Sequence, residues 1–167
     1  MPNHVKNIIT FTGNPNEIHD LMEKVKGYDK DYGYEVSFDF EKIIPMPEDV
    51  YRGDLGEEEK ELYPGDKNWF NWCINHWGTK WNAYEHGDYY DHIEFQTAWA
   101  APHPVIKKLS EIYPNLKITH RWADEDIGYN CGKRIYQNGK ILSERAKAED
   151  LPKDRAYAKK IWGSDLW

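Results

Sequence analysis

The chain has 167 residues and a formal net charge of -7, and 15% of its residues are aromatic, including eight Trp and twelve Tyr. This composition excludes a disordered chain, and the length fits one domain with one hydrophobic core. The acidic balance argues against nonspecific nucleic-acid binding, which needs a basic surface. Without an apolar run long enough to span a membrane, or a signal-peptide pattern at its start, the chain is expected to be cytoplasmic, with its two cysteines as thiols.

The first part of the chain predicts a strand, a helix and a second strand. Residues 4–12 alternate apolar and polar side chains, the period of a strand covered on one face. Residues 16–27 carry apolar side chains at helical spacing and end on a glycine. After a polar, tyrosine-rich loop at 28–34, residues 36–41 alternate again and predict the second strand.

The middle of the chain, residues 48–91, predicts a surface insertion that contains one short aromatic helix. Its first part is rich in glycine and acidic residues and has no clear apolar period, although it could hold a helical turn. The helix that follows should end at Gly78, where a left-handed cap is expected. One face of this helix carries Trp69, Trp72, Cys73, His76 and Trp77.

The last part of the chain repeats the first pattern and adds a hairpin. Residues 93–99 predict a third strand, residues 102–113 a helix opened by prolines, and residues 116–122 a fourth strand. Asn138-Gly139 is the strongest short signal for a hairpin turn, because both positions tolerate positive φ. Residues 150–162 predict a final amphipathic helix.

Two strand–helix–strand units around one core predict an α+β protein with a ferredoxin-like split β-α-β sandwich. The expected sheet is antiparallel with the spatial order 4-1-3-2, and the C-terminal hairpin extends it. The Trp-rich helical segment would be an insertion between strands 2 and 3. We therefore expect a single domain over residues 1–167.

Several short motifs also occur together in one known family. They are MPN at 1–3, FDF at 38–40, PMP at 45–47, WCINHWGTKWNA at 72–83, FQTAWAAP at 95–102, and the pairs Gly128-Tyr129, Cys131-Gly132 and Asn138-Gly139. In these residues the sequence resembles the YubB-like, ferredoxin-like family of phage and plasmid proteins, over residues 1 to about 145. Val5-Lys6 depart from the pattern, where the family would have a tryptophan–cysteine pair, and the last helix lies outside it. The resemblance implies the fold and a genomic setting in phages and mobile elements, without any established reaction or catalytic residues.

The aromatic block has two interpretations. Tryptophan is enriched at interface hot spots, but Trp69, Trp72 and Trp77 at helical spacing favour core packing. Trp81 lies beyond the helix cap and is expected to be exposed. Lys80 either faces a partner or pairs with an acidic loop, and the sequence favours neither.

The predicted topology gathers polar residues at one edge of the sheet. Strands 3 and 4 run in the same direction, so their ends should meet where strand 1 begins. His4, Trp99, Asp124, Glu125 and Asp126 would lie there, in a cleft that could support acid–base chemistry or hold a metal. Because three consecutive acids cannot all point one way, solvated loop acids are the favoured interpretation.

Two further groups of metal-ligating residue types do not predict a metal site. Cys73, His76 and Cys131 lack the fourth ligand that structural zinc requires. A second group has the composition of any polar loop before a strand: it consists of His86, Asp88, Asp91 and His92. We therefore expect no metal and no cofactor.

The open face of the predicted sheet argues against RNA recognition, which stacks bases on aromatic side chains. No aromatic residue occurs among its positions, which are Lys6, Ile8, Thr10, Glu94, Gln96, Ala98, Lys117, Thr119 and Arg121. The sequence favours a non-catalytic module that binds a host-encoded or element-encoded protein. The alternatives are a small hydrolase at the acidic edge and an acidic DNA mimic that inhibits a host protein. The candidate binding residues are Trp77, Lys80, Trp81, Trp99, Asp124, Glu125 and Tyr129.

Overall fold

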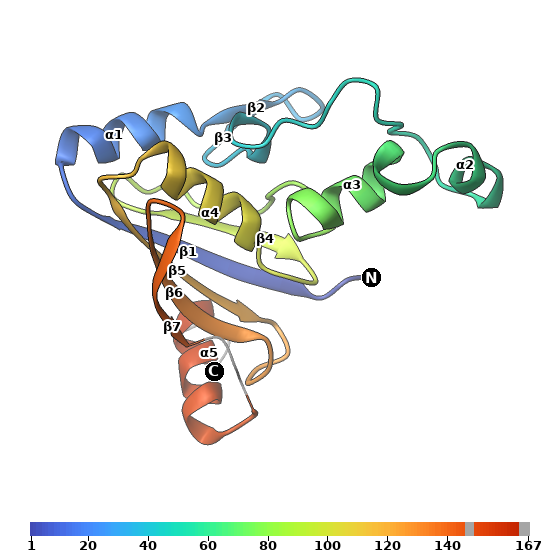
Figure 1. Cartoon of the computed structure of the whole chain (residues 1–167). Coiled ribbons are helices and arrows are strands. Elements are labelled where there is room, and N and C mark those ends of the chain that lie inside the picture. The colour runs from blue at the N-terminus through green and yellow to red at the C-terminus, as the bar shows by residue number, and fades with distance from the viewer. Residues whose placement is uncertain (146–148, 164–167) are drawn as a thin grey trace.

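An antiparallel five-stranded sheet with the order β4-β1-β5-β6-β7 organises the fold (Figure 1). The computed structural model describes residues 1–145 and 149–163. The strands of this sheet are β1 (His4–Thr12), β4 (Ile93–Ala98), β5 (Lys117–Asp124), β6 (Cys131–Gln137) and β7 (Lys140–Arg145). A separate two-stranded sheet is formed by β2 (Gly27–Asp29) and β3 (Tyr34–Val36).

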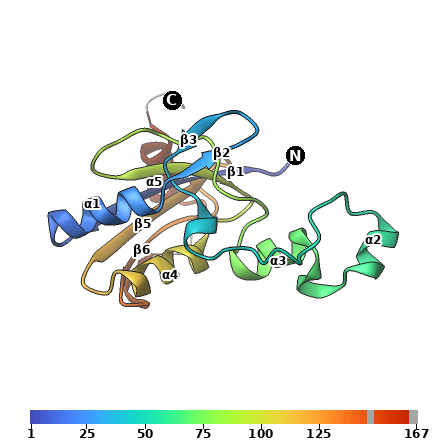
Figure 2. The ribbon, with the colours of Figure 1, turned by 90° about the horizontal axis from the view of Figure 1, so that it is seen from above.

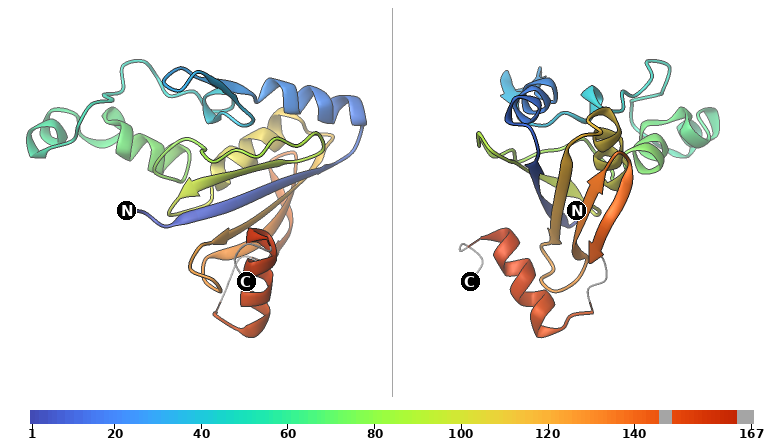
Figure 3. Two further views of the ribbon diagram at one scale, coloured as in Figure 1. Left: turned by 180° about the vertical axis from the view of Figure 1, so that it is seen from behind. Right: turned by 60° about the vertical axis from the view of Figure 1, so that its left-hand side comes forward.

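Helices cover both faces of the large sheet. They are α1 (Pro15–Lys24), α2 (Glu57–Leu62), α3 (Trp69–His76), α4 (His103–Ile112) and α5 (Pro152–Trp162), with short 3-10 turns at Phe40–Lys42 and Gly65–Lys67. Helices α1, α3 and α4 lie on one side of the sheet and α5 on the other (Figure 3). Seen from above, α2 extends away from the sheet beyond α3 (Figure 2). No helix in the described ranges is long and apolar enough to cross a membrane.

The alternation in residues 4–12 gives β1 one buried face. Val5 and Ile9 are fully buried on it, whereas Lys6 and Thr10 are only partly covered on the other. β1 pairs antiparallel with β4 on one edge and with β5 on the other. The α+β class is therefore confirmed, β1 lies between the predicted third and fourth strands (β4 and β5), and the C-terminal hairpin extends the sheet beyond β5.

The second predicted strand, residues 36–41, does not join the large sheet. β3 ends at Val36, and the apolar alternation continues into a loop that buries Phe38 and Phe40, with the Phe38 ring 4.9 Å from that of Phe95. The free edge of β4 is instead bridged by Tyr84, which exchanges backbone hydrogen bonds of 3.0 and 2.7 Å with Gln96. Apolar residues at every second position are expected in a strand, but a segment outside the sheet that buries Phe38 and Phe40 has the same pattern. The sequence pattern therefore could not distinguish the two, and the predicted strand was wrong.

The turn between β6 and β7 has the predicted conformation. Asn138 and Gly139 have φ values of 50° and 75°, as a type I′ turn requires. The backbone N–H of Gly139 donates to Ser110 Oγ at 2.9 Å, which fastens the turn to α4. The predicted final helix is also present, and Ala158 and Ile161 of α5 pack against Ala123 and Cys131.

A buried polar network joins the neighbouring strands β4, β1 and β5. Asn7 donates from Nδ2 to Val5 O and to Thr97 Oγ1, which leaves its Oδ1 to accept from His120 Nε2 at 2.9 Å. Burial lowers the pKa of His120 well below 6.5, and His103 and Arg134 lower it further. Burial, with the charge of Arg134, also lowers the pKa of His103 to about 4. Both rings are therefore neutral in the folded protein at pH 7.

We expect the free energy of unfolding to fall as the pH is lowered from 7.5 to 5. Both histidines have a folded-state pKa below the unfolded value near 6.5, so the unfolded chain binds more protons in this interval. The shift of His103 alone corresponds to a loss of roughly 2 kcal/mol at pH 5. Urea unfolding at the two pH values measures the change. The His103→Gln variant should lose less stability, and an equal loss in both proteins would contradict this account.

Candidate functional site

The ends of β4 and β5 meet the start of β1 at one edge of the sheet. The N–H of Trp99, just after β4, donates to Asn3 O at 2.9 Å, and the N–H of Glu125, just after β5, donates to His4 O at 2.9 Å. The structure therefore brings together the residues that the topology places at this edge. Antiparallel pairing on both sides of β1 is the cause.

Lys80 lies between two exposed tryptophan rings at this edge. Its Nζ is 4.4 Å from the centroid of the Trp81 ring and 4.9 Å from that of Trp99, within the range of cation–π attraction. Trp81 is 40% exposed and Trp99 43% exposed. Phe70 packs edge-on against Trp99 and Tyr84 edge-on against Trp81. We call this surface, formed by Phe70, Lys80, Trp81, Tyr84 and Trp99, the aromatic rim.

The segment after α3 is shaped to deliver Lys80 and Trp81 to this place. Gly78 has a φ of 77°, and a Cβ there would lie 2.8 Å from Pro104 Cδ, so glycine suits both the turn and the close approach. Thr79 is fully buried, and its Oγ1 donates to Ala98 O at 2.6 Å. This bond joins the end of the aromatic helix to the end of β4, which places the two tryptophans on neighbouring segments.

Trp99 occupies a backbone conformation that large residues rarely adopt. Its φ is 71°, in the left-handed region, where a side chain with a Cβ is strained. Two hydrogen bonds hold it: its N–H donates to Asn3 O at 2.9 Å, and its carbonyl accepts from Asn130 Nδ2 at 3.1 Å. A glycine would fit this turn without strain, so the tryptophan side chain is kept at a cost in stability.

The aromatic rim continues into a polar end at His4 and Glu125. His4 Nδ1 and the hydroxyl of Tyr84 are 2.7 Å apart, and Glu125 Oε1 accepts from the N–H of His4 at 2.9 Å. Burial raises the pKa of Tyr84 to about 12, and the charges of Glu125 and Glu85 add to the effect. The hydroxyl therefore stays protonated at neutral pH and can donate to His4.

Asp124 is a structural residue at this edge. Its Oδ1 accepts from Asn3 Nδ2 at 3.0 Å and from the N–H of Asp126 at 2.9 Å, and its Oδ2 accepts from Asn130 Nδ2 at 3.3 Å. The side chain is buried. Both oxygens of this candidate binding residue are therefore engaged in holding the β5–β6 loop and the chain start.

Two other candidate binding residues lie elsewhere. Trp77 is only 3% exposed, and its Nε1 donates to Ile44 O at 2.9 Å, so its ring belongs to the core, as helical spacing had favoured. The structure therefore places Trp77, one of the candidate binding residues, in the hydrophobic core. Tyr129 is exposed, but its hydroxyl donates to Asp150 at 3.1 Å, next to the start of α5.

The candidate metal ligands do not converge in the part of the chain that the structure describes, where no three His, Cys, Asp or Glu side chains are arranged to hold an ion. Cys73 and Cys131 lie buried in different hydrophobic clusters. His86 faces Ser37 and the carbonyl of Ala83. His92 instead pairs with Asp91 and, at 3.4 Å, with Glu94.

Sequence reasoning missed Tyr84 and Phe70 as members of the aromatic rim. Phe70 directly follows Trp69 in the aromatic helix but points to another face, toward Trp99. Tyr84 lies in a loop whose apolar residues show no regular spacing, so the sequence offers only the presence of an aromatic residue as a hint of its role. Its position became visible only through its pairing with Gln96 on the edge of β4.

A family model described as the ferredoxin-like domain in Api92-like protein matches residues 76–163. The match includes α5, which the resemblance drawn from sequence motifs had left out. Among solved structures, the chain is similar to protein Api92 from Yersinia pseudotuberculosis, with 17% identity and a TM-score of 0.47. This similarity covers 68% of the chain and 41% of that protein, so the chain spans less than half of its length. A comparison with curated proteins gives no match.

Replacing Trp99 should separate backbone strain from side-chain function. We expect Trp99→Gly to be more stable than Trp99→Ala by about 1 kcal/mol, because glycine adopts the left-handed conformation without a Cβ penalty. Urea denaturation of the two variants measures the difference. Equal stability would mean that the backbone at this position is not strained.

Replacing the neighbouring acids should separate structural from exposed carboxylates. Asp124→Ala should lower the free energy of unfolding by roughly 1 to 3 kcal/mol, because it removes a buried carboxylate that accepts three hydrogen bonds. Glu125→Ala, at an exposed position, should change it by about 0.5 kcal/mol or less. Thermal or urea unfolding compares the two. A larger loss from Glu125→Ala would reverse the roles assigned to these residues.

Proposed function

Since the chain belongs to the family of the ferredoxin-like domain in Api92-like protein, we propose that it is a non-catalytic module that binds another protein through the aromatic rim. The observation that carries this proposal is Trp99, a large exposed side chain held in a strained backbone conformation beside a second exposed tryptophan. Strain of this kind persists where surrounding contacts impose it, and it is concentrated at functional sites.

The chemistry of the aromatic rim supports binding to a protein surface. Tryptophan and tyrosine are enriched in the centres of interfaces, because they bury a large area at little cost in side-chain entropy. Lys80 holds both indole rings in place before a partner arrives, which reduces that cost further. Glu125 and His4 would supply the polar border of such an interface.

A hydrolase at the same edge has less support. A hydrolase would need a carboxylate that hydrogen-bonds to a catalytic imidazole. The carboxylate of Asp124 instead accepts hydrogen bonds from Asn3, Asn130 and the backbone of the β5–β6 loop. The imidazole of His4 contacts Tyr84. Neither group is therefore arranged as a general acid or base with a free carboxylate partner.

The setting of this function rests on the sequence motifs alone. The resemblance to YubB-like proteins, with α3 as a Trp-rich insertion between β3 and β4, supports an accessory role in a phage or mobile element. The partner would then be a cytoplasmic protein encoded by the host or by the element. An aromatic interface of this kind should depend weakly on salt, whereas an acidic DNA mimic would lose its partner as salt rises.

Site-specific photo-crosslinking tests the proposal. A photoreactive phenylalanine at Phe70 lies beside Trp99 while leaving both tryptophans intact, and the same group at exposed Ile141 on β7 serves as the matched control. We expect one protein to be crosslinked in bacterial cells from position 70 and not from position 141. Against the purified partner, Trp81→Ala or Trp99→Ala should weaken binding by at least about ten-fold, as hot-spot tryptophans do.

Two results would contradict the proposal. One is the same set of crosslinked proteins from positions 70 and 141, which indicates random encounters. The other is a partner whose affinity is unchanged in the Trp81→Ala and Trp99→Ala variants, provided that both are folded by circular dichroism.

A further inference from the structure

Three neighbouring pockets lie between α1 and the β2–β3 hairpin on one side and residues 82–90 on the other. Their volumes are about 450, 210 and 220 Å³, each large enough for a single long side chain. The first two share Lys26 and Asp88 in their linings, and the second and third are both lined by β3 and the residues just after it. We call this row of pockets the acidic groove.

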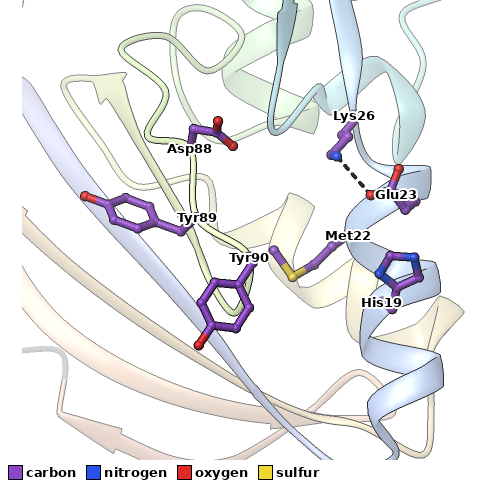
Figure 4. Close-up of a pocket in the computed structure, with 7 residues that line it drawn as sticks. All are labelled: His19, Met22, Glu23, Lys26, Asp88, Tyr89 and Tyr90. Carbon is purple, nitrogen blue, oxygen red and sulfur yellow. Dashed lines mark hydrogen bonds and ion pairs between the residues drawn. The ribbon is translucent and has the colours of Figure 1, made fainter.

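The largest pocket is open between two walls (Figure 4). One wall is α1, which carries His19, Met22 and Glu23, with Lys26 just beyond its end, and the other is the loop that carries Asp88, Tyr89 and Tyr90. Met22 extends from α1 toward Tyr90 and gives the pocket an apolar floor (Figure 4). The pocket therefore combines a thioether, the phenol ring of Tyr90 and charged groups, whereas the Tyr89 ring is directed away from α1 (Figure 4) and stacks on His92.

Carboxylates outnumber cations around Lys26. Its Nζ is 2.9 Å from Glu23 Oε1 and 3.9 Å from Glu35 Oε1, so one ammonium joins α1 to β3. The hydrogen bond from Lys26 to Glu23 raises the pKa of Lys26, and the charges of Glu23, Glu35 and Asp88 raise it as well. Three carboxylates thus share one ammonium, which leaves a local excess of two negative charges, and a further Lys or Arg side chain would offset one of them.

Exposed tyrosines flank the groove on both sides. Tyr28, Tyr32 and Tyr34 stand on the β2–β3 hairpin, and Tyr89 and Tyr90 on the opposite loop, where Tyr90 is 93% exposed. Acidic residues alone are common on a chain of this charge, but here Tyr89 and Tyr90 also line the first pocket and Tyr28 lines the third. Tyrosine faces attract Lys and Arg side chains, and tyrosine-rich surfaces are typical of protein-recognition sites.

We propose that the acidic groove binds an extended, basic segment of a partner protein, with Lys or Arg side chains seated in successive pockets. The pockets occur in a row, which suits an extended chain that presents a side chain to each of them. The negative charge complements the basic side chains and repels the phosphates of nucleic acids. This site is separate from the aromatic rim and would serve a second contact.

Fluorescence anisotropy with labelled peptides tests the acidic groove on the full chain. The probes are a fluorescein-labelled decapeptide of alternating Arg and Ser, and its counterpart with Glu in place of Arg. The Arg peptide should bind saturably and the Glu peptide should not. The double variant Glu35→Gln with Asp88→Asn keeps the side-chain shapes, and it should weaken binding by about ten-fold. Tyr90→Ala should weaken binding by about three-fold through lost cation–π contact.

The matched control is the double variant Glu57→Gln with Glu58→Gln, which removes the same charge from exposed positions at the start of α2. It should change the affinity by less than about two-fold. Equal weakening by both double variants would overturn the proposal, because it would mean attraction by net charge alone. No saturable binding of the Arg peptide would also overturn it.

Three further arms identify the ligand and the site. Spermidine and a labelled single-stranded DNA are tested as alternative ligands. If either binds with the same dependence on Glu35 and Asp88 and the Arg peptide does not bind, the assignment to a peptide is overturned. The Trp81→Ala and Trp99→Ala variants should bind the Arg peptide as the unmodified protein does. Loss of peptide binding in these variants would place the peptide site at the aromatic rim and would overturn the proposal for the acidic groove. If only the crosslinking at the aromatic rim fails, the proposed binding function of the rim is contradicted and the proposal for the acidic groove still stands.

Discussion

Backbone hydrogen bonds run along both edges of β1, to β4 on one side and to β5 on the other, and this double pairing determines where the remaining parts lie. It aligns the ends of β4 and β5 with the start of β1, so that Asn3, Trp99 and Asp124 become neighbours. It also leaves the second edge of β4 to the loop that contains Tyr84, because the expected strand there is absent. One edge of β4 pairs with β1, and the other edge pairs with the loop that contains Tyr84. These two pairings position the aromatic rim and one wall of the acidic groove.

The sequence predicts best those parts of the fold in which the residue pattern is compatible with only one local structure. The alternation in residues 4–12 and the Asn138-Gly139 turn are such patterns, and both structures are present. Residues 36–41 are compatible with two, since Phe38 and Phe40 bury their rings equally well from a loop. Periodicity reports which side chains are buried, and only the hydrogen-bond partners of the backbone decide whether they belong to a strand.

The candidate sites were less accessible to sequence reasoning, because they depend on contacts between segments far apart in the chain. The exposure of Trp81 could be predicted, because this residue follows a helix cap. The burial of Asp124 could not, because its partners Asn3 and Asn130 are not connected to it by any local sequence pattern. The tyrosines of the acidic groove were visible as a polar, tyrosine-rich loop. The opposite wall of the groove comes from a distant part of the chain, where Asn82 and Ala83 share a pocket with Tyr28, and no local pattern connects the two.

The backbone of Trp99 is held by a residue that precedes β1 and by another that follows β5. During synthesis on the ribosome, Asn3 emerges first and Asn130 only after most of the chain has left the exit tunnel. Until Asn130 has emerged, only the bond to Asn3 can hold the strained turn. A partner that recognises the aromatic rim would therefore bind less well to chains truncated before Asn130.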